Sequence, residues 1–188
     1  MMGAGELKVS GAGDALMEAD FSYNVSEWKP KVGYDVSGGT GELSIKQVNG
    51  EGVRLGSKAR NEWDIRLNDE PTDLVVAMGA GKSDLDLDSL TLTELDLQMG
   101  AGKITVDLTG DYARSFDSSI EGGVGEANVL VPSEVGVRVR AEGGLGKINA
   151  EGFRREGDSY VNDVYGDSDV NLDVDVQGGV GQINLEVV

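Results

Sequence analysis

The sequence predicts an all-β fold, a single-domain β-solenoid that is similar to a parallel β-helix, on the basis of two observations. A glycine turn recurs at intervals near 21 residues in the middle of the chain. The residues after each turn alternate strictly between apolar and polar, which is typical of a strand with one buried face. A solenoid stacks equivalent units, here called rungs, so that equivalent side chains form ladders along its axis. We expect about seven rungs, one for each glycine turn.

The glycine turns share the pattern Gly-x-Gly, and their second glycines are 36, 40, 21, 23, 21 and 35 residues apart. The three intervals near 21 define the unit, and the three longer ones contain an insertion. Glycine suits a corner where the backbone turns with positive φ or lies close against the next rung. The turns are Gly3-Ala4-Gly5, Gly39-Thr40-Gly41, Gly79-Ala80-Gly81, Gly100-Ala101-Gly102, Gly123-Val124-Gly125, Gly144-Leu145-Gly146 and Gly179-Val180-Gly181.

The alternation around these turns predicts a strand on each side of most corners. Two and four residues after the second glycine, thirteen of fourteen positions are apolar, and Ser83 is the exception. One and three residues after it, all fourteen positions are polar. Apolar residues also alternate before the turns, as in Leu95, Leu97 and Met99. A hairpin meander would show Asn-Gly or Asp-Gly turns, which are nearly absent apart from Asn49-Gly50.

We expect one domain over residues 1–188. Residues 1–60 would hold the N-terminal rungs, an aromatic-rich cap and an insertion, and residues 61–188 would hold the regular rungs. The stretch from Gln47 to Arg60 is predicted to be a surface loop. A second excursion is predicted at about residues 152–169, before the last rung.

The composition excludes several classes of function. The chain has 34 acidic and 16 basic side chains, so its formal net charge of −18 argues against binding nucleic acid. It has no cysteine and no histidine, which removes disulfides, thiolate chemistry and most hydrolase triads and zinc sites. No apolar run is long enough to span a membrane. We therefore assign no catalytic, cofactor-binding or metal-binding residues and expect no enzymatic activity.

Two motifs invite functional interpretations that the pattern does not favour. Gly79-Ala80-Gly81-Lys82-Ser83 lacks the first glycine of a phosphate-binding loop, because Val76 occupies that place, and a strand follows it where a helix would be needed. Acidic side chains could hold calcium, but an exposed acidic strand face is the more common structure. The candidates are Asp84, Asp86 and Asp88, with Asp96 and Asp107 expected nearby, and Asp163, Asp167 and Asp169 in a loop.

Two sets of polar residues share equivalent positions and should form ladders. Lys103, Glu126 and Lys147 would alternate their charges on successive rungs and fix the register. Amide side chains three residues after the corner could hydrogen-bond up the stack. These are Asn128, Asn149 and Asn184.

Aromatic residues gather in the first 63 positions. Such rings can bind sugars, but in a solenoid they more often cap an end of the core. The residues are Phe21, Tyr23, Trp28, Tyr34 and Trp63. Arg154 and Arg155 could hold an anionic polymer, although arginines beside Glu156 usually form a solvated loop.

Residues 119–188 resemble the C-terminal domain of LiaF-type bacterial envelope-stress proteins. The resemblance is in Gly122-Gly123-Val124-Gly125 followed by Val131-Pro132, in Gly143-Gly144-Leu145-Gly146, and in the closing Gly178-Gly179-Val180-Gly181. The Asn61-Glu62-Trp63 segment and two Met-Gly-Ala-Gly-Lys turns are similar to toast-rack and adhesin-like β-solenoid domains of bacteria. This resemblance implies a module of the bacterial cell envelope, extracytoplasmic or membrane-tethered in the full-length protein, that adheres to surfaces or takes part in sensing cell-wall stress.

The leading hypothesis is a non-enzymatic interaction module whose partner is a protein or a cell-wall polymer. One alternative is a polysaccharide-active β-helix enzyme, which would need two carboxyl groups about 5 to 9 Å apart in a cleft. Another is a calcium-stabilised adhesive domain. We also expect that an exposed solenoid end, such as a first rung beginning at Met1, could pair with a second copy.

Overall fold

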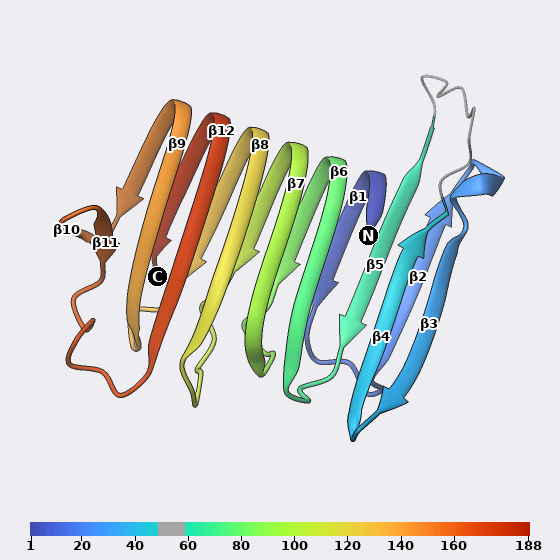
Figure 1. Ribbon diagram of the computed structural model, residues 1–188, viewed down its shortest axis with the longest axis horizontal. Helices are drawn as coiled ribbons and strands as arrows, with labels where there is room; N and C mark the ends of the chain where they lie inside the picture. Colours follow the sequence, from blue (N-terminus) through green and yellow to red (C-terminus); the bar gives the residue numbers. More distant parts are fainter. Residues whose placement is uncertain (49–58) are drawn as a thin grey trace.

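The computed structural model describes residues 1–48 and 59–188. These residues form β-strands and a single 3-10 helix, η1 (Ser26–Trp28), so the predicted all-β fold class is confirmed (Figure 1). Ten strands make one long sheet, and β3 and β4 form a separate hairpin. The strands are β1 (Met2–Ser10), β2 (Met17–Tyr23), β3 (Pro30–Ser37), β4 (Thr40–Gln47), β5 (Asn61–Leu67), β6 (Thr72–Asp86), β7 (Leu92–Asp107), β8 (Phe116–Val131), β9 (Gly136–Glu151), β10 (Arg154–Glu156), β11 (Ser159–Val161) and β12 (Asn171–Val187).

Five strands of 15 to 17 residues, β6, β7, β8, β9 and β12, contain a glycine corner. Each folds over at this corner, so that the arm before the glycines faces the arm after them (Figure 1). Alternate side chains of both arms meet in the space between, where Leu97, Ile120, Val129 and Val176 are at most 1% exposed. The core is therefore built from the apolar positions that the alternation predicted.

The rungs do not stack in sequence order. The sheet order is β10-β11-β9-β12-β8-β7-β6-β1-β5-β2, and the strands from β9 to β5 run parallel. The last strand, β12, lies between β8 and β9, and the first strand, β1, lies between β6 and β5. The expectation of an exposed first rung at Met1 was therefore wrong, because β1 pairs with β6 along its length and residues 6–10 also pair with β5. The edges of the sheet are the antiparallel strands β2 and β10.

Six of the seven glycine turns are corners of the stack, and the second one is different. Gly39-Thr40-Gly41 belongs to the antiparallel β3–β4 hairpin. The turn of this hairpin has Gly38 (φ 60°) and Gly39 (φ 88°) as its central residues. Two successive positive φ angles define the type I′ turn that joins hairpin strands. At the six corners, the second glycine of each Gly-x-Gly has positive φ and the first does not.

The corners need glycine for both of the reasons the sequence indicated. Gly125 has φ 142°, and a Cβ there would lie 1.7 Å from the carbonyl oxygen of Gly102 in the adjacent strand. A Cβ on the first glycine of that turn, Gly123, would lie 2.2 Å from the carbonyl oxygen of Gly100. Each corner thus lies directly against its neighbour, and side chains at these positions would force the rungs apart.

The structure describes one of the two predicted insertions in full, and that insertion lies at the β9 end of the sheet. Most of the predicted loop from Gln47 to Arg60, including Asn49-Gly50, falls outside the described residues. The excursion at 152–169 forms the β10–β11 hairpin, and β11 pairs antiparallel with β9. Asn162, which follows β11, is 1% exposed and anchors the excursion to the end of the core. The extent of the domain, residues 1–188, stays a prediction.

Candidate functional site

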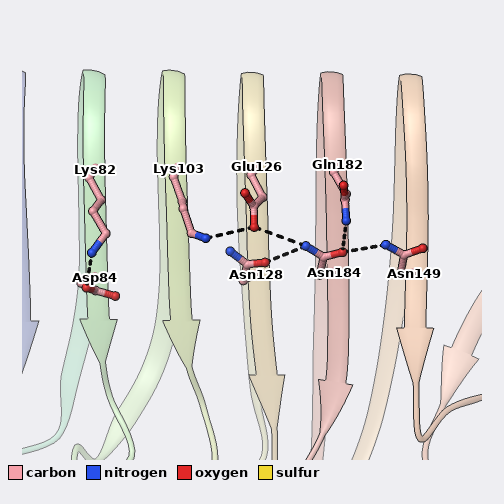
Figure 2. Close-up of polar contacts among 8 residues, drawn as sticks. All are labelled: Lys82, Asp84, Lys103, Glu126, Asn128, Asn149, Gln182 and Asn184. Carbon is pink, nitrogen blue, oxygen red and sulfur yellow. Dashed lines mark hydrogen bonds and ion pairs between the residues drawn. The ribbon is translucent and has the colours of Figure 1, made fainter.

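The arms after the corners carry ladders of polar side chains across the sheet (Figure 2). Lys103 Nζ lies 3.0 Å from Glu126 Oε1, and this hydrogen bond is the main cause that lowers the pKa of Glu126. Lys147 does not lie beside Glu126 as expected, because β12 places Gln182 between them. From β7 to β9 the ladder therefore consists of Lys103, Glu126, Gln182 and Lys147. Of its three neighbouring pairs, only Lys103 and Glu126 form an ion pair.

The predicted asparagine ladder is present. Asn184 Nδ2 donates to Asn128 Oδ1 at 2.7 Å, and Asn149 Nδ2 donates to Asn184 Oδ1 at 2.8 Å (Figure 2). The three amides link β8, β12 and β9 in the register of the sheet. This ladder joins strands and leaves no cluster of free groups that could do chemistry.

The acidic candidates are spread over different parts of the molecule. Asp84 accepts a hydrogen bond from Lys82 Nζ at 2.7 Å. Asp86 is level with Asp107, as expected, whereas Asp96 lies on the arm before the corner, level with Val75 and Ser119. The expectation that Asp96 joins this group was wrong, because the fold at the corner puts the two arms on opposite outer faces.

Within residues 1–48 and 59–188, no three acidic side chains come together in a group that could hold a metal ion. The loop carboxylates Asp163, Asp167 and Asp169 follow β11 and give no such group either. The described part of the chain therefore gives no geometric support to the calcium alternative.

Two of the five aromatic candidates, Phe21 and Trp63, lie at the β5 and β2 end of the hydrophobic core. Trp63 is 3% exposed, packs edge-on against Phe21 with ring centroids 5.5 Å apart, and donates from Nε1 to Asn61 Oδ1 at 3.0 Å. Trp28 is also buried. Tyr34, in contrast, is 54% exposed on β3. The cap interpretation holds for Trp63, and the burial of both tryptophans leaves neither ring face open to a sugar.

The arginine pair lies on the β10–β11 hairpin. Arg154 Nη1 is 3.3 Å from Glu156 Oε2, and the Arg155 guanidinium lies over the Tyr160 ring at 6.0 Å from its centroid. Arg154 and Glu156 are each more than half exposed. These contacts satisfy both cations locally, as expected for a solvated loop.

The motif that resembles a phosphate-binding loop is a rung corner. Its residues lie within β6, which continues as a strand after the glycines. Lys82 is held by Asp84, and Ser83 is 2% exposed with its Oγ 3.4 Å from Met78 Sδ. Neither side chain is available to a phosphate group.

Sequence reasoning missed an open groove of about 830 Å³ on the arms before the corners. It crosses the strands and runs along the axis of the stack from β1 to β12. Its floor includes corner glycines, and at Gly79, Gly100, Gly123 and Gly179 a Cβ would meet the backbone of the neighbouring strand. The lining residues include Gly3, Gly79, Gly100, Gly123 and Gly179, the polar residues Lys46, Gln47, Gln98, Glu121 and Gln177, and Ala77.

The polar wall of this groove is a ladder in register. Ala77, Gln98, Glu121 and Gln177 are successive partners across β6, β7, β8 and β12, so neighbouring side chains are about 4.8 Å apart. Gln47 and Lys46 of β4 line the groove at the β1 end. The sequence contains a signal for the ladder, since Ala77, Gln98, Glu121 and Gln177 each stand four positions before the second glycine of their turn.

An apolar ridge follows the corners. Val180 is level with Val124 on one side and with Leu145 on the other, and these three side chains are 48%, 56% and 73% exposed. Contiguous exposed aliphatic residues on an acidic protein are typical of a contact surface. In the described residues, no helix is both long and apolar enough to cross a membrane.

Comparison with known proteins agrees with this architecture. The family model described as the N-terminal domain of toast_rack, DUF2154, matches residues 1–130. A crystal structure described as a "putative cell adhesion protein" from Clostridium sporogenes superposes with a TM-score of 0.96 and 40% sequence identity, over 100% of this chain and 90% of that one. A search of curated proteins gave no match. With a family model that covers more than half of its length, the chain belongs to the toast-rack family.

Proposed function

We propose that the protein is a non-enzymatic binding module of the bacterial cell envelope, located outside the cytoplasm, that holds an extended protein segment or wall polymer in its groove. The observation that carries the proposal is the groove itself, a polar ladder beside a bare glycine floor that crosses successive strands of one sheet. The 40% identity with the protein described as a "putative cell adhesion protein" supports the same function.

The shape of the groove suits a chain-like partner. Glycines at the corners carry no side chains, so the backbone itself forms the floor of the groove and leaves it open to a strand-sized or sugar-sized chain. Gln98 and Gln177 offer amide donors and acceptors, and Glu121 between them offers an acceptor. The net charge of −18 favours a neutral or cationic partner over a polyanion.

The groove does not favour the enzymatic alternative. Hydrolysis of a glycosidic bond needs a pair of carboxyl groups across the scissile bond. Among the described residues that line the groove, Glu121 alone carries a carboxylate. A role in cell-wall stress sensing is an extension of the LiaF-type resemblance and depends on which partner the groove binds.

Co-sedimentation with isolated bacterial cell walls tests the proposal. The wild-type chain should sediment with the walls, and the double variant Gln98→Ala/Gln177→Ala should lose most of this binding. Gln182→Ala is the matched control, because it removes a glutamine from the opposite outer face of the same strand as Gln177. Walls treated with protease separate a polymer partner from a protein partner.

Three outcomes would contradict the proposal. If the wild-type chain does not sediment with treated or untreated walls, it is not a wall-binding module. If the double variant and the Gln182→Ala control bind equally, the groove is not the site. Release of soluble sugar from the walls by the wild-type chain would revive the enzymatic alternative.

A further inference from the structure

The β3–β4 hairpin has an unpaired edge that the rest of the fold does not use. In the described residues β3 pairs with β4 alone, and every residue of β3 after Pro30 is exposed. The hairpin lies at the β5 and β2 end of the long sheet (Figure 1). β4 is anchored to the rest of the molecule, since Leu43 and Ile45 pack against the core and Met1 donates to the carbonyl oxygen of Ile45 at 2.7 Å. The open edge of β3 is a template for another strand.

One face of β3 is an exposed apolar row. Val32, Tyr34 and Val36 are 48%, 54% and 66% exposed. Val32 is paired with Ile45 of β4, and Tyr34 is paired with Leu43. The type I′ turn and the register direct the backbone N–H and C=O groups of the same three residues toward the open edge. The edge therefore offers hydrogen bonds and apolar side chains together.

The opposite face of the hairpin carries like charges in direct opposition. Lys31 is level with Lys46, and Asp35 is level with Glu42. None of these four side chains forms an ion pair within the part of the chain that the structure describes. Like charges opposite each other in a sheet are destabilising, so a partner strand that brings opposite charges next to Lys31 and Asp35 would offset this repulsion.

We propose that β3 pairs antiparallel with β3 of a second copy, about a two-fold axis at Gly33, to form a four-stranded sheet across a homodimer. In this register Lys31 lies opposite the Asp35 of the other copy, and Asp35 lies opposite its Lys31. Val32 lies opposite Tyr34 of the other copy, which is a favourable pair of a β-branched and an aromatic residue. The strand is thus complementary to itself in charge, side-chain type and hydrogen-bonding groups.

The register also accommodates Gly33 and Pro30, the two residues of β3 that are least suited to a paired strand. Gly33 lies on the symmetry axis and faces the Gly33 of the other copy, so the axis adds no side-chain contact to the interface. Pro30 lies opposite Val36 at the end of the paired segment, where its missing N–H costs at most the outermost hydrogen bond on each side. The dimer is independent of the groove, since β3 contributes no residue to the groove lining.

Sedimentation velocity over a range of protein concentrations tests this dimer with charge-swapped variants. The wild-type chain should dimerise reversibly. Asp35→Lys places lysines opposite each other, and Lys31→Asp places aspartates opposite each other, so each variant alone should weaken dimerisation by about tenfold or more. An equimolar mixture of the two variants should recover it as a heterodimer, because each then faces the opposite charge.

Asp158→Lys is the control for Asp35→Lys, because it makes the same change of charge in the turn between β10 and β11. It should dimerise like the wild type, and circular dichroism should show that all variants are folded. A wild-type chain that stays monomeric at high concentration would overturn the proposal. So would dimers that survive both single swaps, or a mixture that associates no better than either variant alone.

Discussion

Asn184 donates a hydrogen bond from Nδ2 to Oδ1 of Asn128 at 2.7 Å, although 56 residues of sequence separate them. On its other side Asn184 accepts a hydrogen bond from Asn149 at 2.8 Å. The residue thus joins the last strand of the chain to two strands that are not joined to each other. The C-terminal strand closes the gap between β8 and β9 and cannot be removed without dividing the sheet.

Replacing Asn184 should weaken this junction. Asn184→Ala removes the hydrogen bonds to Asn128 and Asn149 and should lower the free energy of unfolding by about 1–2 kcal/mol. Asn149→Ala removes one bond from the exposed end of the ladder and should cost less than about 0.5 kcal/mol. Urea denaturation of both variants gives the comparison, and equal losses would show that the ladder does not hold β12 in place.

The glycine corners give a second prediction, which separates two effects of adding a Cβ to glycine. Gly125→Ala meets both an unfavourable φ of 142° and a carbonyl oxygen 1.7 Å from the new Cβ, and it should cost more than about 4 kcal/mol or prevent folding. Gly157 also has positive φ, 61°, but a Cβ there meets no atom within 4 Å.

Gly157→Ala is therefore the control, and it should cost about 1–2 kcal/mol from backbone strain alone. Thermal unfolding of the two variants, followed by circular dichroism, measures the difference. A Gly125→Ala protein that melts within a few degrees of the Gly157→Ala protein would mean that the rungs can move apart at the corners.

The sequence was sufficient to predict the corners, the buried positions and the asparagine ladder, because each depends on residues within one repeat unit. Alternation around Gly125 determines which side chains of β8 face the core, whatever strand lies beside it. The stacking order could not be predicted in this way. All rungs present similar corners, so nothing in the repeat itself distinguishes β9 from β12 as the neighbour of β8.

The groove escaped prediction for a related reason. Gln98 and Gln177 are ordinary exposed strand residues in the sequence, 79 positions apart. They become part of one wall only when β7, β8 and β12 stack with their corners level. The hairpin at Gly39 was mistaken for a corner because the Gly-x-Gly spacing does not show which glycine has positive φ.

Asn162 gives a third prediction, at the end of the core. Its Nδ2 donates to the carbonyl oxygens of Val135 at 2.7 Å and Pro132 at 3.2 Å, and its Oδ1 accepts from the amide of Val137 at 3.0 Å. Asn162→Ala leaves three backbone groups without these partners in a buried place and should cost about 2–4 kcal/mol.

Asn171→Ala is a suitable comparison for Asn162→Ala, because it also removes a partly buried amide but breaks a single side-chain donor bond, to Ser168 at 3.1 Å. The Oδ1 of Asn171 has no hydrogen-bond partner, so its removal should offset part of that loss and keep the cost below about 1 kcal/mol. Urea midpoints that rank the two variants in the reverse order would contradict the role assigned to Asn162.

Asp86, the last residue of β6, gives a prediction of pH dependence. Desolvation first, and then the neighbouring carboxylates of Asp88 and Asp107, raise the pKa of Asp86. The folded state therefore binds this proton more tightly than the unfolded chain, and the ionised group at neutral pH destabilises the fold. As the pH falls through the raised pKa toward the ordinary value of 3.8, that destabilisation disappears.

Asp86→Asn should consequently raise the urea midpoint at neutral pH, and the gain should shrink as the pH approaches about 4. Asp84→Asn is the matched control on the same strand, since its carboxylate is paired with Lys82 at 2.7 Å and its loss should bring no gain at neutral pH. The measurement is urea denaturation of the wild type and both variants at the two pH values. A gain for Asp86→Asn that is the same at both pH values would show that desolvation and crowding of the ionised Asp86 carboxylate are not its cause. A gain for Asp84→Asn would show that reducing the net negative charge is sufficient.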